Sequence, residues 1–135
     1  MSTEATRKIA QKWIGYVQDN HYEKLDALAA PNANWWVAGL KEKIPVAGDM
    51  PYTQRRKAAQ DLASGAEKST TTLVGLMADH NVAVLEVFRT LDGPGNRHYE
   101  TYAIVKLTVV NGKIQEVREY LDFFSLYKYL GVPGF

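Results

Sequence analysis

The hydrophobic periodicity of the chain changes once, and this change limits the folds that are open to it. Residues 1–65 carry apolar side chains at helical spacing, whereas residues 70–121 alternate in character with a period of two. Asn111-Gly112 and the run 92–96 are hairpin signals between such strands. Helices followed by a meander of antiparallel strands predict an α+β fold rather than an alternating α/β fold.

The pattern predicts four helices and five strands, with Ser2 or Thr3, Thr53 and Asp122 as helix caps. Three helices packed on one curved antiparallel sheet would form a cone-shaped barrel around the N-terminal helices, with a central pocket. Residues 1–135 are expected to form a single domain. The first expected helix ends at residue 18, and the other three cover 22–30, 54–63 and 123–130. The expected strands cover 34–38, 70–78, 82–91, 98–110 and 113–121.

Composition argues against several classes of function. Lysine and arginine total 16 and aspartate and glutamate total 15, so the chain lacks the basic surplus of a nucleic-acid-binding protein. It has no cysteine, and its three histidines are scattered, so neither a metal site nor a cofactor is expected. No apolar run approaches the roughly 20 residues that span a membrane. The first 18 residues show no signal-peptide pattern, and a cytoplasmic protein is expected.

Two carboxylates stand out because each lies between apolar neighbours on one face of an expected strand. Glu86 shares its face with Val84 and Phe88, and Glu119 lies between Val117 and Leu121. Such a glutamate can be exposed or can form a structural ion pair. Alternatively, it is a desolvated acid whose pKa is raised toward neutrality, which suits proton transfer.

Aromatic and basic residues give weaker indications. Trp35 and Trp36 are adjacent, so one should face the core and the other should face outward. The strand 82–91 is apolar on both faces, which suggests that a second copy covers the sheet in a homodimer. The basic run 55–57 at a helix start is expected on a solvated face.

Four segments carry a resemblance to a known superfamily. They are Trp35–Gly39 after two helices, Val82–Glu86, Tyr99–Tyr102 and the closing run Asn111–Asp122. Together they resemble the nuclear transport factor 2-like superfamily, in particular its SnoaL-like, ketosteroid-isomerase-like and limonene-epoxide-hydrolase-like branch. This fold hosts several reactions, so the resemblance implies the fold more strongly than the chemistry.

The resemblance also implies roles for individual residues. The catalytic aspartate of the epoxide-hydrolase-like and SnoaL-like proteins falls at Glu119. The earlier Arg-x-Asp pair of the hydrolases falls at Val84-Leu85-Glu86, which keeps the carboxylate and loses the arginine. The three catalytic positions of ketosteroid isomerase fall at Trp13, Trp36 and Val105, which cannot perform its chemistry.

We therefore expect a cofactor-independent acid/base enzyme for a hydrophobic, cyclic small molecule, of cyclase, hydrolase, dehydratase or isomerase type. Glu119 would be the principal acid or base and Glu86 its partner. The alternative is a non-catalytic binding or dimerisation module, in which Glu86 or Glu119 pairs with a cation such as Arg118, Arg89 or Lys106. The residues expected to shape the pocket are Trp35, Trp36, Tyr16, Phe88, Tyr102, Val105 and Leu121.

Overall fold

The computed structural model describes residues 1–135, and its N-terminal elements are two helices. Helix α1 (Thr3–Asp19) begins where the Ser2 side chain accepts the backbone N–H of Ala5, which confirms the expected cap. It ends at Asn20, whose φ of 57° turns the chain back toward the helix. Helix α2 (Tyr22–Ala27) is shorter than expected, because residues 29–30 already belong to a strand.

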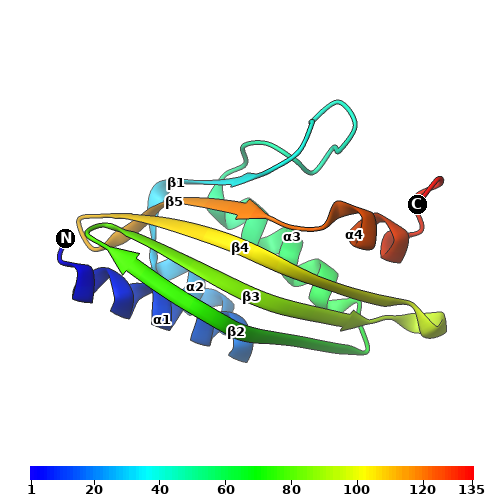
Figure 1. The fold of residues 1–135 in the computed structure, drawn as a ribbon, viewed down its shortest axis with the longest axis horizontal. Helices are drawn as coiled ribbons and strands as arrows, with labels where there is room; N and C mark the ends of the chain where they lie inside the picture. Colours follow the sequence, from blue (N-terminus) through cyan, green and yellow to red (C-terminus); the bar gives the residue numbers. More distant parts are fainter.

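A five-stranded sheet forms the other layer (Figure 1). Strands β2 (Lys68–Asp79), β3 (Val82–Asp92), β4 (His98–Val110) and β5 (Lys113–Tyr120) pair with their neighbours in antiparallel fashion, as expected. Strand β1 (Ala29–Val37) pairs with β5 in parallel, so the sheet is mixed. Parallel strands need a long connection, and the whole segment between β1 and β5 provides it.

The remaining helices close the structure around one face of the sheet. Helix α3 (Tyr52–Ser64) follows the loop 38–51, and its N-cap is Pro51 rather than the expected Thr53. Helix α4 (Phe123–Leu130) begins where the Asp122 carboxylate accepts the N–H groups of residues 124 and 125, which confirms that cap. Figure 1 shows α1, α2 and α3 on the same side of the sheet, with the opposite side open.

The main core lies between this sheet face and the helices. Alternate residues of the strands point toward the helices, so an alternating strand buries only one of its two faces. Trp13 and Ile14 of α1 pack against this face from the helical side. The buried strand residues of the core include Ala83, Leu85, Val87, Ala103, Val105 and Leu107.

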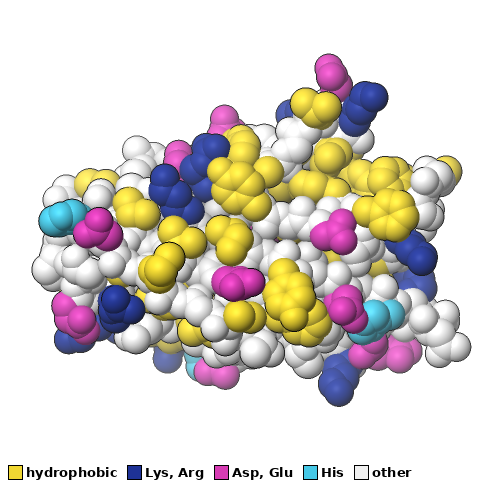
Figure 2. All heavy atoms as spheres, viewed as in Figure 1, with side chains coloured by type: hydrophobic (Ala, Val, Ile, Leu, Met, Phe, Trp, Pro, Cys, Tyr) yellow, Lys and Arg dark blue, Asp and Glu magenta, His cyan; other side chains and the backbone are white.

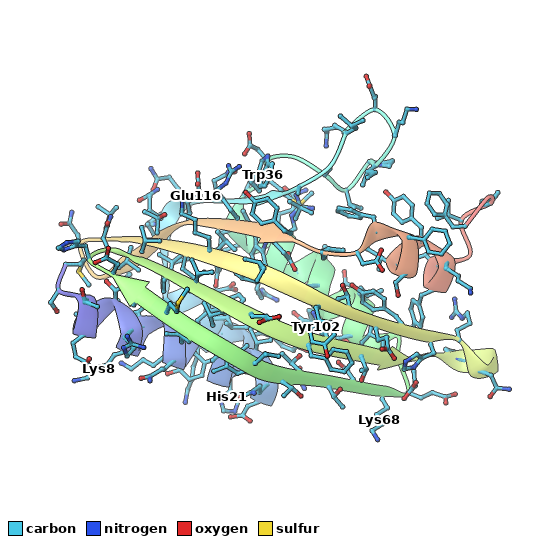
Figure 3. All side chains as sticks on the ribbon, viewed as in Figure 1. Lys8, His21, Trp36, Lys68, Tyr102 and Glu116 are labelled. Atoms are coloured by element: carbon cyan, nitrogen blue, oxygen red, sulfur yellow. The ribbon has the colours of Figure 1, made fainter.

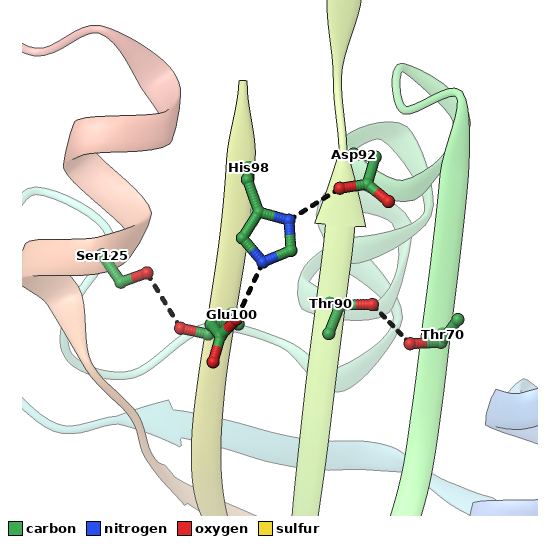
Figure 4. A network of polar contacts seen from close by, with 6 residues as sticks. All are labelled: Thr70, Thr90, Asp92, His98, Glu100 and Ser125. Carbon is green, nitrogen blue, oxygen red and sulfur yellow. Dashed lines mark hydrogen bonds and ion pairs between the residues drawn. The ribbon is translucent and has the colours of Figure 1, made fainter. Parts of the chain in front are cut away.

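A polar network ties strand ends to helix α4 at the end of the sheet near the hairpin 92–98 (Figure 4). His98 lies between the Asp92 and Glu100 carboxylates, at 2.6 and 2.8 Å. Hydrogen bonds to Asp92 and then to Glu100 raise the pKa of His98. Ser125 of α4 donates its hydroxyl proton to the Glu100 carbonyl at 2.9 Å. The network therefore fixes α4 beside β4.

None of the four helices combines the length and the apolar character of a membrane-crossing segment.

Candidate functional site

A cavity of about 310 Å³ lies between the inner face of the sheet and the helices. Twenty of its 28 lining residues are hydrophobic, so its walls favour an apolar ligand and exclude water. The walls come from all four helices and all five strands, and Val46 of the loop 38–51 also contributes. Small-molecule sites in proteins are typically enclosed and mostly apolar in this way.

Glu119 supplies the only carboxylate of the cavity wall. It pairs with Val105 of β4 and Val37 of β1, both buried, which places its side chain on the inner face. The indole N–H of Trp35 donates a hydrogen bond to Glu119 Oε1 at 3.1 Å. Trp35 is in turn held between the rings of Trp13 and Tyr52, at 6.0 and 5.4 Å between centroids. One carboxylate oxygen is thus held by a fixed donor.

Burial raises the pKa of Glu119 above its ordinary value. The Trp35 hydrogen bond and the charges of Arg89 and Arg55 act in the opposite direction but do not cancel the effect of burial. Glu119 is half-buried, and its side chain lines the cavity. Neither arginine forms an ion pair with Glu119 within 4.0 Å. Glu119 therefore keeps a proton to a higher pH than an exposed glutamate.

Three arginines line the same cavity, and they differ in their partners. Arg56 is paired with Asp26 through two contacts of 2.8 Å. Arg55 donates from Nη1 to the Val46 carbonyl at 2.6 Å and from Nη2 to the Gly48 carbonyl at 2.8 Å. Arg89 has a buried Nε with no hydrogen-bond partner. Arg55 and Arg56 thus leave the solvated face expected of the basic run 55–57, because α3 packs that side over the cavity.

The structure brings four of the expected site residues together and leaves five elsewhere. Glu119, Trp35, Val105 and Leu121 line the cavity. Trp36 stacks under the Arg118 guanidinium at 3.7 Å, and Figure 3 shows Trp36 and Tyr102 on the open face of the sheet. The five residues that do not line the cavity are Tyr16, Trp36, Glu86, Phe88 and Tyr102.

The expected pairing of Glu86 with Glu119 requires correction. Glu86 pairs with Ile104, whereas its neighbour Leu85 pairs with Val105, the partner of Glu119. Residues paired across strands share a face, so Glu86 lies on the face opposite Glu119. Alternation within a strand separates its two faces, but only the register between strands shows which faces coincide.

Sequence reasoning assigned no binding role to Arg89, Arg55, Tyr99 or Trp13, all of which line the cavity. The sequence did contain a signal for Arg89, since it lies two residues after the buried Val87 and therefore on the same, inner face of β3. Arg55 and Trp13 lie on helices, where a cavity-lining position looks like any other buried position. Burial, more than any other influence, raises the pKa of Tyr99, to about 12, so its hydroxyl stays protonated.

Comparison with known proteins gives relatives of this fold. No protein-family model matches the chain. UPF0523 protein B of Dictyostelium discoideum is 28% identical over 121 residues, which cover 85% of this chain and 74% of that protein. An NTF2-like protein from Burkholderia xenovorans superposes with a TM-score of 0.73 at 22% identity, covering 96% of this chain and 98% of that one. An LEH-like epoxide hydrolase from M. tuberculosis superposes with a TM-score of 0.71 at 16% identity, covering 95% and 90%.

Proposed function

We propose that this chain, which has the fold of the NTF2-like proteins, is a cofactor-independent enzyme that moves a proton on a small, mainly apolar molecule. The observation that carries the proposal is Glu119, a lone carboxylate in an apolar cavity. The LEH-like hydrolase of the same fold supports an enzymatic role. We keep the expectation of a hydrophobic, cyclic substrate.

Glu119 would act as both acid and base. Its raised pKa extends to higher pH the range over which the protonated form is present, and that form would donate to a substrate oxygen. Trp35 fixes Oε1, so that the other oxygen exchanges the proton. After donating, the carboxylate accepts a proton from a neighbouring carbon or oxygen of the same molecule. Such a shuttle suits a double-bond isomerisation, a dehydration or a cyclisation.

The absence of a second carboxylate in the cavity narrows the choice among these reactions. A hydrolase that uses two acids needs one to protonate the leaving oxygen and another to activate water. Glu86 lies on the opposite face of the sheet and cannot fill the second role. The geometry therefore supports proton transfer by Glu119 alone better than the pair of Glu119 and Glu86 expected from the sequence.

Turnover of a panel of cyclic epoxides, enones and polyketide-like compounds tests the proposal. The Glu119→Gln variant should lose 100-fold or more in kcat on any active compound, since general acid–base catalysis contributes about 10²–10⁴-fold. The Glu86→Gln variant is the matched control and should retain wild-type turnover. A Glu119→Gln variant with full turnover would refute the role of Glu119. Binding of panel compounds without turnover would favour the non-catalytic alternative.

We also propose that a second copy of the chain covers the open face of the sheet. Figure 2 shows hydrophobic side chains gathered over this face. Met77 and Tyr102 are 73% and 63% exposed there, and Phe88 stacks on Tyr102 at 4.7 Å. Large exposed apolar patches mark interaction sites on soluble proteins. Pairing of two identical open faces would bury both patches at once.

A further inference from the structure

We infer that the ligand of the cavity carries an anionic group, such as a carboxylate, that binds Arg89. The inference rests on the proposed function, because it describes the molecule on which Glu119 would act. It starts from the charges of the cavity wall and from the one guanidinium there that has no partner.

The cavity wall has more positive than negative charge in either protonation state of Glu119. Its charged residues are Glu119 and three arginines, of which Arg56 is neutralised by Asp26. With Glu119 ionised, Arg55 and Arg89 leave one positive charge in excess, and with Glu119 protonated they leave two. Arginine does not lose its proton in proteins, so the excess persists at every physiological pH. An anionic ligand would balance it.

Arg89 is the arginine that is free to bind such a ligand. The Nε of Arg55 is also buried without a partner, but both of its terminal nitrogens already donate to backbone carbonyls. Arg89 makes no ion pair and no hydrogen bond, and its Nε is buried. A buried polar group without a partner costs free energy, which a ligand oxygen would recover. A guanidinium also matches the planar geometry of a carboxylate.

The positions of Arg89 and Glu119 suit two ends of one molecule. Arg89 pairs with Thr101 of β4 and Glu119 pairs with Val105, four residues further along that strand. Their backbone positions are therefore separated by roughly 13 Å along the strand direction. The inner-face residues between these two positions, Val87 and Ala103, are apolar and line the cavity. Thr71, directly across from Arg89 on β2, lines the cavity as well and offers a hydroxyl donor beside it.

The expected ligand is thus an amphiphilic acid. Its anionic group contacts Arg89, its apolar body lies against the inner face, and its reacting part lies at Glu119. A neutral molecule of the same shape would satisfy the apolar walls but would leave the guanidinium without a partner.

Calorimetric titration of octanoate and 1-octanol at pH 7.5 tests the inference. Octanoate should bind the wild-type protein at least tenfold more tightly than 1-octanol. The Arg89→Gln variant should lose tenfold or more in octanoate affinity and less than twofold in 1-octanol affinity, as expected for loss of a charge-assisted hydrogen bond. Arg89→Lys should retain part of the preference for octanoate. Arg7→Gln, on α1, is the control and should bind both compounds as the wild type does.

Several outcomes would overturn the inference. They are equal affinity of the wild type for the two compounds, an equal loss of both in Arg89→Gln, and no binding of octanoate. If 1-octanol binds without preference for octanoate and Glu119→Gln still loses turnover, the proposed function stands and only this inference fails. If Arg89 selects octanoate while Glu119→Gln retains turnover, the proposed function fails instead.

Discussion

Glu119 couples the chemistry of the cavity to the stability of the chain. The raised pKa means that the folded state keeps a proton which the unfolded state releases above pH 4.5. The free energy of unfolding should therefore fall as pH rises from about 4.5 through the pKa of the folded state. At a pH above the folded-state pKa, each unit by which that pKa is raised costs about 1.4 kcal/mol of folding stability. The side chain lies near the end of β5, at a residue paired on both sides with β1 and β4.

Replacement of Glu119 by glutamine should remove this dependence on pH. At pH 8 the Glu119→Gln variant should be at least as stable as the wild type, with a gain of up to about 1 kcal/mol in the free energy of unfolding. Its stability should also vary less between pH 5 and pH 8. Urea unfolding at these two values measures the difference. A variant that loses more stability at pH 8 than at pH 5 would show that Glu119 stabilises the fold in its ionised form.

Trp35 should set how far the pKa of Glu119 rises. Its indole hydrogen bond lowers that pKa, so Trp35→Phe should raise the pKa further while keeping an aromatic ring in the core. Side-chain carboxyl NMR of Glu119 across a pH series measures the change. Trp36→Phe, on the open face, is the matched control and should leave the Glu119 pKa where it is. An equal shift in both variants would exclude a specific effect of the indole N–H.

At the scale of elements, the loop 38–51 is held over the cavity by backbone hydrogen bonds to β1 and by one side chain from α3. Arg55 donates to the carbonyls of residues 46 and 48, while Lys41 braces the loop internally through the carbonyls of residues 45 and 47. Gly39 has a φ of +135°, and a Cβ there would lie 3.1 Å from Ala47 Cβ. The loop therefore depends on a turn that only glycine adopts easily and on one buried guanidinium.

Loss of the Arg55 guanidinium should loosen this loop before it affects the rest of the fold. In Arg55→Met, the Val46 carbonyl loses its donor and the Gly48 carbonyl keeps only the Val37 N–H, which should cost about 1–3 kcal/mol of stability. Amide hydrogen exchange should quicken across residues 38–50 and stay unchanged in β3 and β4. Lys57→Gln, on the exposed side of α3, is the control. Uniform quickening across the chain would point to global destabilisation, and no change would show that the loop holds itself.

The sequence predicted most elements well because their signals are local. The strand 98–110 and the helix 123–130 have the predicted bounds, and the Asn111-Gly112 turn joins β4 to β5. The length of β1 and its parallel partner were not predictable, because the pairing joins distant segments. The same limit explains why Glu86 was expected beside Glu119 but lies on the opposite face of the sheet. Its apolar neighbours were read correctly, but the register that places them opposite Glu119 is a property of three strands together.

At the scale of the whole molecule, the two faces of the sheet serve different ends. The inner face builds the cavity, and the outer face presents exposed apolar side chains with isolated carboxylates among them (Figure 2), and Glu86 lies on this face. The side chain of Ile104, adjacent to Tyr102 and Glu86 on this face, is 40% exposed. A dimer through the open faces would leave both cavities on the outside of the assembly.

Light scattering coupled to size exclusion should detect this dimer. The wild type should elute with about twice the 15.2 kDa mass of one chain. Ile104→Glu should elute as a monomer, because the new carboxylate lies opposite Glu86, and unpaired like charges buried at a matched interface cost several kcal/mol. Lys8→Glu, on α1 on the opposite side of the molecule, should remain dimeric. A monomeric wild type at micromolar concentration would refute the assembly.

The parallel pairing of β1 with β5 also has a consequence for the order of folding. The hydrogen bond between Trp35 and Glu119 joins residues 84 positions apart, so a growing chain lacks it until almost all of its length has been synthesised. Contacts over such separations form slowly because they close long loops. Hairpins β2–β3 and β3–β4 can form earlier from neighbouring segments. We therefore expect the nascent chain to form most of its sheet before Trp35 reaches Glu119, so the contact on which the proposed proton transfer depends would be among the last to form.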